Sequence, residues 1–152
     1  MSQFEWSKEK FSVYVADMDE QHKEWLAIIN ELHTCLMTSK TDLTTDKVLK
    51  KMINYTRYHF AEEERLMRDE GYPHYDAHIR AHAHFTSKLM ELKKAVDAGE
   101  LLLRRELMGI LKNWLTDHIQ NTDRLYGQFI MENSTGSVDE APGTISPDIT
   151  PN

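Results

Sequence analysis

Residues 49–67 read LKKMINYTRYHFAEEERLM, and side chains of one kind recur in this stretch at steps of three and four residues. The stripe holds Leu49, Met52, Tyr55, His59, Glu63 and Leu66. This spacing is typical of an amphipathic α-helix that buries one face. His59 and Glu63 share that face with the apolar residues, although a buried imidazole or carboxylate is costly without a partner. The stretch therefore indicates both a helical fold and a polar site inside it.

The same periodicity extends over three further segments. We expect helices over about 18–37, 46–70, 74–98 and 101–131, separated by a polar loop and by turns at Gly71 and Gly99. The other inward stripes hold Met18, His22, Trp25, Ile29, Leu32 and Leu36, then His78, His82, Phe85, Leu89, Leu92 and Val96, and finally Leu107, Leu111, Trp114, His118 and Leu125. Short connections favour antiparallel neighbours. The predicted fold is all-α, an up-down-up-down antiparallel four-helix bundle.

The two ends of the chain differ from this helical middle. Residues 1–17 carry Phe4, Trp6, Phe11, Tyr14 and Val15, which need cover, so we expect an extended arm along the bundle. Residues 132–152 hold three of the four prolines and no aromatic or basic residue. Such a segment buries little area. We predict one domain over 1–131 and a disordered acidic tail over 132–152.

Composition limits the class and location of the protein. A chain of 152 residues suits a single domain with a continuous core. Its net charge of -7 argues against binding to nucleic acid or anionic membranes. The chain shows no signal-peptide pattern and no apolar run near the roughly 18 residues that span a bilayer, so a cytoplasmic location is expected. Cys35 is the single cysteine and is expected to be a core residue.

Seven potential metal ligands lie on the predicted inward faces: His22, His59, Glu63, His78, His82, His118 and Asp123. Residues four apart on a helix share a face, so His59 with Glu63, and His78 with His82, can each converge on one point. Neutral imidazole and carboxylate oxygen suit iron and similar transition metals. The set predicts a two-metal site in the bundle interior. A buried cluster held by hydrogen bonds alone is the alternative.

Two details of this set stay open at the level of spacing. His118 and Asp123 are five residues apart, so one side chain must reach round or the helix must deform locally, as at a π-bulge. His74 precedes His78 by four residues, and periodicity alone cannot choose between the pairs His74/His78 and His78/His82. We expect His33 to be peripheral and His84 to face solvent. The methionines are expected to fill the core.

Several short motifs follow one another along the chain in a defined order. They are Trp6, DEQHK at 19–23, HFAEEE at 59–64, YP at 72–73, the His78/His82 pair followed by Phe85, and WLTDHIQNTDRLYG at 114–127. Over about residues 4–130 this order resembles the hemerythrins, specifically the single-domain bacteriohemerythrins. The resemblance implies that His78, His82 and His118 bind one iron and that His22 and His59 bind the other. It also implies that Glu63 and Asp123 bridge the two irons with an oxo or hydroxo group, which leaves His74 free.

The resemblance implies reversible dioxygen binding, because the iron with two histidines keeps an open position. The dioxygen would be held as a hydroperoxide on that iron, for oxygen carriage, storage or delivery rather than enzymatic turnover. The expected partners are dioxygen and an oxygen-consuming client or reductase of the cytoplasm, with the protein a monomer or weak oligomer. The alternatives are an enzyme that reduces peroxide or nitric oxide, and an oxygen or redox sensor acting on a separate partner. Carboxylate-rich di-iron proteins use Glu-x-x-His motifs, and the chain has none, which favours a carrier.

A dioxygen pocket is expected beside the open position. By helical proximity to the ligands its lining is Trp25, Leu26, Ile29, Phe60, Trp114 and Ile119. Two residues depart from what the family usually carries, since Trp25 replaces a smaller aliphatic residue and Tyr14 stands where glycine is frequent. Trp25 either packs the core or narrows the pocket and slows dioxygen entry and loss.

Overall fold

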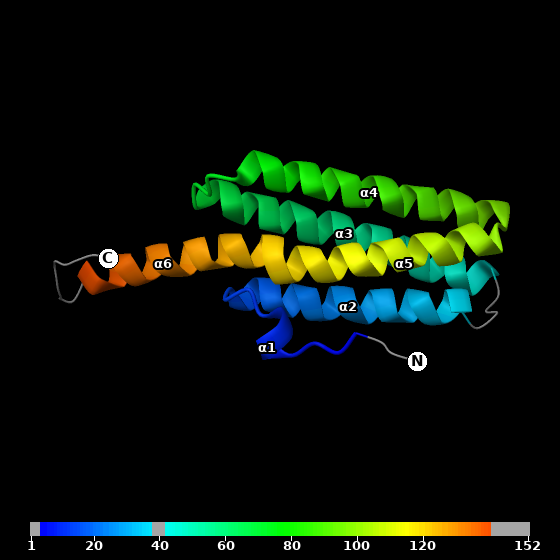
Figure 1. Cartoon of the computed structure of the whole chain (residues 1–152), viewed down its shortest axis with the longest axis horizontal. Helices are drawn as coiled ribbons and strands as arrows, with labels where there is room; N and C mark the ends of the chain where they lie inside the picture. Colours follow the sequence, from blue (N-terminus) through cyan, green and yellow to red (C-terminus); the bar gives the residue numbers. More distant parts are fainter. Residues whose placement is uncertain (1–3, 38–41, 141–152) are drawn as a thin grey trace.

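The computed structural model describes residues 4–37 and 42–140, and in these residues every regular element is a helix. The elements are α1 (Lys8–Phe11), α2 (Ala16–Met37), α3 (Asp42–Asp69), α4 (Tyr75–Ala98), α5 (Leu101–Asp117), the π-helix η1 (His118–Asp123) and α6 (Arg124–Glu140). The last three elements form one continuous rod (Figure 1). Helix α2 packs against α3 and α5, and α4 packs against the same two neighbours. The predicted all-α bundle is confirmed.

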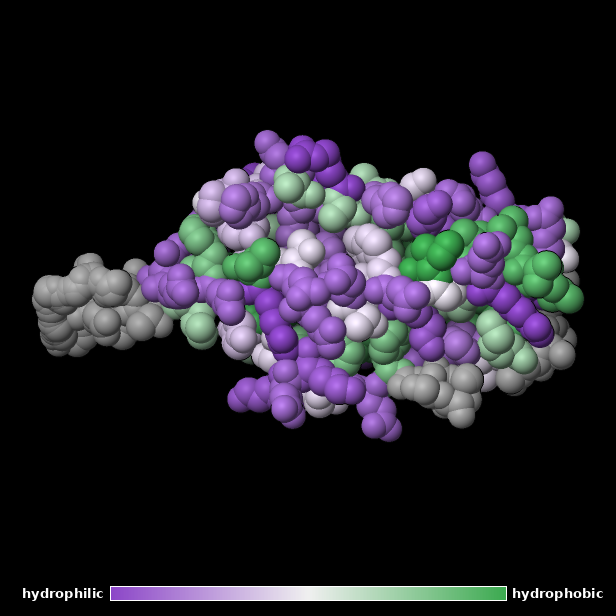
Figure 2. All heavy atoms as spheres, viewed as in Figure 1, coloured by the Kyte–Doolittle hydropathy of each residue, from purple (hydrophilic) through white to green (hydrophobic). Residues whose placement is uncertain are grey.

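A continuous apolar core fills the space between four rods, which are α2, α3, α4 and the continuous rod of α5, η1 and α6. Leu32, Leu49, Leu92 and Leu111 come from different rods, and each is at most 1% exposed. Burying a side chain of this size contributes about 1.5–3 kcal/mol, so the inward stripes account for the association of the helices. Polar residues cover most of the face drawn in Figure 2, with hydrophobic surface mainly at the end where α5 begins. None of the described helices has an apolar run that could cross a lipid bilayer.

The end of α4 has a simple local cause. Gly99 adopts φ 72°, and its N–H bonds to the carbonyls of Ala95 and Val96. Glycine takes this left-handed conformation without the steric cost that a Cβ brings. The chain can therefore turn at once into α5, which begins at Leu101 and returns antiparallel to α4.

The N-terminal arm differs from the extended segment that the sequence suggested. Residues 8–11 form the short helix α1, and Tyr14 does not obtain the expected cover, since it is 46% exposed with φ 68°. Phe11 and Val13 are buried instead. The arm reverses direction at Tyr14 before α2 begins, and a positive φ costs a non-glycine residue roughly 1–2 kcal/mol.

Hydrogen bonds hold this arm to Arg124 at the start of α6 and to Asp19 of α2. The guanidinium of Arg124 donates to the carbonyls of Ser12 (3.0 Å) and Glu9 (2.7 Å). The carboxylate of Asp19 accepts hydrogen bonds from the Ser12 hydroxyl and the Val13 N–H. At the crossing point, a Cβ placed on Gly127 would lie 1.7 Å from the Val13 carbonyl oxygen. The arm and the rod can approach this closely only because residue 127 is glycine.

The C-terminal boundary also needs correction. Helix α6 continues to Glu140, so the start of the segment predicted to be a disordered tail at 132 is helical. Extending an existing helix adds one hydrogen bond per residue without a new nucleation cost, and residues 132–141 contain no proline. The rest of the predicted tail, 141–152, lies outside the described residues, as does part of the predicted loop at 38–41.

Candidate metal centre

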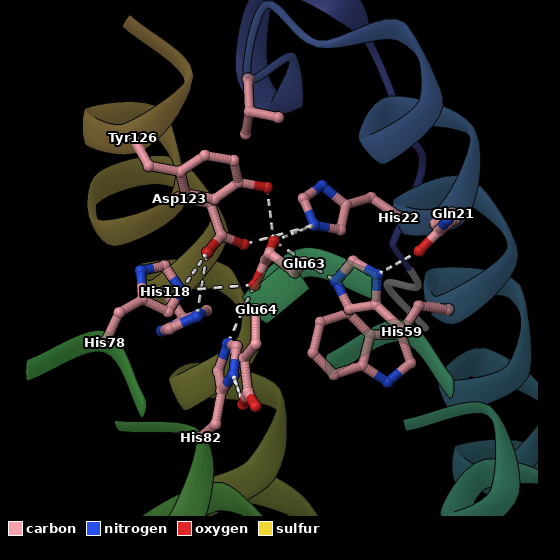
Figure 3. A network of polar contacts seen from close by, with 12 residues as sticks. Gln21, His22, His59, Glu63, Glu64, His78, His82, His118, Asp123 and Tyr126 are labelled. Atoms are coloured by element: carbon pink, nitrogen blue, oxygen red, sulfur yellow. Dashed lines mark hydrogen bonds and ion pairs between the residues drawn. The ribbon is translucent and has the colours of Figure 1, made fainter. Parts of the chain in front are cut away.

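All seven predicted ligands meet in the interior of the bundle. Every one is at most 3% exposed, and each of the four rods contributes. Helix α2 supplies one histidine, α3 the pair at 59 and 63, α4 the pair at 78 and 82, and η1 the pair at 118 and 123 (Figure 3). The pairs on α3 and α4 converge as expected from their four-residue spacing. His74 and His84 are exposed, and half-buried His33 pairs with Lys112.

The π-helix η1 explains how His118 and Asp123 reach the same point. A π-helix has a wider turn than an α-helix, so residues five apart come to lie on one face. The local deformation that the spacing allowed is therefore present. It also shifts the register of α6, because Leu125, predicted to point inward, is 58% exposed while Tyr126 is fully buried.

The cluster divides into two halves that share the two carboxylates. The three-histidine half comprises His78, His82 and His118 with Glu63 Oε1 and Asp123 Oδ1, and the two-histidine half comprises His22 and His59 with Glu63 Oε2 and Asp123 Oδ2. In the first half, the Nε2···O distances are 2.9–3.3 Å. In the second, they are 3.2–3.7 Å. Each carboxylate thus presents one oxygen to each half.

The donor atoms of this cluster fit metal ions rather than one another. The Nε2 atoms of all five histidines, Glu63 Oε1 and both Asp123 oxygens are buried and form no hydrogen bond within the described part of the chain. Buried polar atoms without a partner cost about 1–3 kcal/mol each. Divalent metal ions would satisfy all of these buried atoms together, since each atom is a nitrogen or oxygen of the kind that binds such ions. Either half offers enough ligands to hold an ion.

In the absence of metal, some of the candidate ligands in the cluster are protonated. Burial lowers the pKa of both His22 and His78, but the close Asp123 and Glu63 carboxylates favour the charged imidazoles, outweigh the effect of burial and raise each pKa to about 9. Burial dominates at His59 and lowers its pKa to about 3. Burial also acts to raise the pKa values of the two carboxylates, yet the surrounding histidines hold both well below their usual values. Metal binding must therefore displace protons from this site.

A second layer of side chains orients the ligands, and the sequence interpretation did not assign it. His59 Nδ1 donates to Gln21 Oε1 at 2.8 Å, and His82 Nδ1 donates to Glu64 Oε2 at 2.7 Å. The buried Tyr126 hydroxyl donates to Glu63 Oε2 at 2.5 Å (Figure 3). A bond at Nδ1 fixes the tautomer that leaves Nε2 free as a ligand. Gln21 and Glu64 adjoin ligands within DEQHK and HFAEEE, and that adjacency was the available signal.

Aromatic rings pack against the imidazoles on one side of the cluster. Phe60 stacks on His82 with ring centroids 3.7 Å apart, and half-buried Trp114 stacks on His118 at 4.2 Å. Trp25 is fully buried, with its ring 4.7 Å from that of His59. Its indole N–H donates to Thr56, which satisfies the polar atom. The other predicted lining residues, Leu26, Ile29 and Ile119, are buried as well.

Comparison with known proteins agrees with this geometry. Residues 13–130 match the family model described as the hemerythrin HHE cation binding domain. The chain belongs to the hemerythrin family. It is 34% identical to a bacteriohemerythrin of Stenotrophomonas maltophilia over 127 residues, which cover 78% of this chain and 82% of that one.

Other hemerythrins show the same likeness. A bacteriohemerythrin of Pseudomonas aeruginosa is 38% identical over 109 residues, covering 72% of this chain and 70% of the relative. A wild-type hemerythrin crystal structure superposes with a TM-score of 0.76 and 30% identity, over 84% of this chain and 97% of that chain. The family model matches the arm from residue 13, the helices α2 to α5, η1 and the first part of α6, up to residue 130.

Proposed function

We propose that this hemerythrin binds dioxygen reversibly at a di-iron centre, for oxygen carriage, storage or delivery. His78, His82 and His118 would hold one iron, and His22 and His59 the other. Glu63 and Asp123 would contribute an oxygen to each. Two reduced irons supply the two electrons that reversible binding of dioxygen requires.

The division of the carboxylate oxygens carries this proposal. Glu63 Oε1 faces His82 at 2.9 Å while its Oε2 faces His59 at 3.6 Å. Asp123 likewise directs Oδ1 to His118 and Oδ2 to His22. A single-metal site has no need of this double set. The unequal number of imidazoles leaves the two-histidine half with fewer protein ligands, and this half is therefore where a small molecule would bind.

Reversible dioxygen binding also requires a site that excludes water, and the residues around the cluster support this. Trp25, Phe60 and Phe85 form a layer in which ring centroids are 5.4–5.9 Å apart, and Trp114 extends it at 4.5 Å from Phe85. Apolar walls exclude water and the protons that would otherwise consume a reduced oxygen species. The Tyr126 hydroxyl, which reaches the cluster, is already bonded to Glu63. These features favour retention of dioxygen over its chemical turnover.

Iron content and visible spectra test this function. We expect two irons per chain and an absorption band that appears when the reduced protein meets air and disappears when oxygen is removed. Two irons that oxidise without a reversible band would contradict the carrier. Sustained consumption of peroxide or nitric oxide with an electron donor would instead favour the enzyme.

The ligand assignment is tested separately by substitution. His118→Ala should abolish stable binding of two irons, because it removes one of three imidazoles in its half. His84→Ala is the matched control, since His84 is exposed, and it should retain both irons. Full di-iron occupancy in the His118 variant would refute the assignment.

A further inference from the structure

We propose that the two halves bind metal with unequal affinity, the three-histidine half filling first and the two-histidine half second and more exchangeably. This inference rests on the proposed di-metal centre. It assigns part of the inequality to three residues outside the ligand set, Gln21, Glu64 and Tyr126. The protein would then have a stable one-metal state and could exchange a single ion.

Preorganisation is the first difference between the halves. Cis ligands on a metal with bonds of about 2.1 Å lie about 3 Å apart. The three-histidine half already has Nε2···O distances of 2.9–3.3 Å. The two-histidine half has distances of 3.2–3.7 Å and must contract when it binds an ion. It also offers one imidazole fewer, so both effects act in the same direction.

The residues behind the imidazoles are the second difference. His82 donates to the carboxylate of Glu64, whereas His59 donates to the neutral amide of Gln21. A carboxylate at Nδ1 makes an imidazole a stronger metal ligand, and such outer partners typically change metal affinity about 10–100-fold. The anionic partner serves the three-histidine half and the neutral partner serves the two-histidine half.

The shared carboxylate Glu63 is the third difference. Tyr126 donates a hydrogen bond to Oε2, which draws electron density from the oxygen that faces His22 and His59. Oε1, which faces His78 and His82, forms no hydrogen bond among the described residues. The carboxylate therefore directs the oxygen that is the stronger electron donor, Oε1, to the three-histidine half. The Nε2···O distances, the residues bonded to Nδ1 and the asymmetry of Glu63 all favour filling of the three-histidine half first.

Stepwise metal titration tests the order. Co²⁺ would be titrated into the iron-depleted full chain in competition with a chelator of known affinity, and the two binding constants would be fitted with the visible spectrum as a site signal. We expect two steps that differ by at least about tenfold. His59→Gln should keep the tight step, and His82→Gln should lose it.

A reciprocal pair of variants tests the cause. Glu64→Gln should weaken the first step about 10–100-fold, and Gln21→Glu should strengthen the second, so each narrows the ratio of the two constants. Glu62→Gln and Gln128→Glu make the same chemical changes at residues outside the ligand contacts, and the ratio should not change. If the depleted chain does not fold, chelator-driven release from the iron-loaded chain gives the same comparison as two kinetic phases.

The outcomes separate this inference from the proposed function. Two ions that bind with equal constants would overturn the inference but leave the di-metal centre intact. An unchanged ratio in both Glu64→Gln and Gln21→Glu would overturn the assigned cause. Binding of fewer than two ions by the unmodified chain would overturn the di-metal centre itself.

Discussion

Trp25 lies beside a candidate ligand of the two-histidine half. Its ring lies 4.7 Å from His59 and it is fully buried, so it occupies space beside a ligand rather than at the surface. We expect Trp25→Leu to speed both the entry and the loss of dioxygen at least about tenfold, equivalent to a barrier lowered by about 1.4 kcal/mol. Stopped-flow measurement of both rates checks this. Trp6→Leu, in the half-buried arm, is the matched control, and unchanged rates in the Trp25 variant would mean that Trp25 only packs the core.

Tyr126 stabilises the cluster when metal is absent. Its hydroxyl is the donor to Glu63 Oε2 at 2.5 Å, and the phenol is fully buried. Tyr126→Phe leaves a buried carboxylate oxygen without that donor, so we expect the metal-free protein to lose about 1–3 kcal/mol of unfolding free energy. Urea unfolding measures the loss. Tyr75→Phe removes only an exposed bond with Arg68 and should change stability by less than about 0.5 kcal/mol, so an equal loss in both variants would argue against the role given to Tyr126.

Single residues also mark the limit of what the sequence could predict. Candidate ligands such as His59 and Glu63 could be picked out from the sequence because a polar residue on an apolar stripe violates the helical pattern. Gln21, Glu64 and Tyr126 do not violate it, since glutamine and glutamate are ordinary on a half-exposed face and tyrosine is ordinary in a core. Only the three-dimensional contacts show that these residues hydrogen-bond to the candidate ligands.

At the level of elements, the π-helix separates what spacing can and cannot determine. The five-residue step between His118 and Asp123 required either a side chain that reaches round or a local deformation of the helix, and it could not choose between the two. Continuing an ideal α-helix past His118 put Leu125 inward, whereas the extra residue in η1 moves Tyr126 into that place. An error of one residue in register is therefore sufficient to exchange an exposed leucine for a buried tyrosine.

The contact between the arm and α6 gives a test at the same scale. Gly127→Ala introduces a Cβ that would lie 1.7 Å from the Val13 carbonyl oxygen, so the arm must move away. We expect a loss of about 1–3 kcal/mol, the range for overpacking of a tight contact, and faster proteolysis within the arm. Gly109→Ala is the matched control because nothing lies within 4 Å of its Cβ position. It should stabilise the protein by up to about 1 kcal/mol, and similar behaviour of the two variants would contradict the tight crossing.

For the molecule as a whole, periodicity predicted the bundle well because burial of four apolar stripes leaves few other arrangements. It could not predict where helix formation stops. The sequence after Met131 resembles a disordered segment in composition, yet α6 continues through it to Glu140. Composition reports the capacity to bury area, whereas extension of an existing helix depends on local backbone hydrogen bonds.

The free energy of unfolding of the metal-free protein should decline at alkaline pH, and bound metal should abolish this decline. In the metal-free protein, the pKa values of His22 and His78 rise from 6.5 to about 9, so the folded state binds more protons than the unfolded state between these values. The stability that these histidines add is complete below pH 6.5 and is lost as the pH rises through about 9.

His59 and the two carboxylates have lowered pKa values, and their contribution is lost as the pH falls. We therefore expect the metal-free protein to be most stable near pH 6.5 and to weaken towards pH 9.5. In an iron-loaded protein the imidazoles would be neutral ligands, so binding would release protons and the decline above pH 6.5 should disappear. Urea unfolding of both forms at pH 6.5, 7.5, 8.5 and 9.5 measures this difference. A metal-free protein whose stability is constant or rises over this interval would show that the carboxylates do not hold protons on His22 and His78.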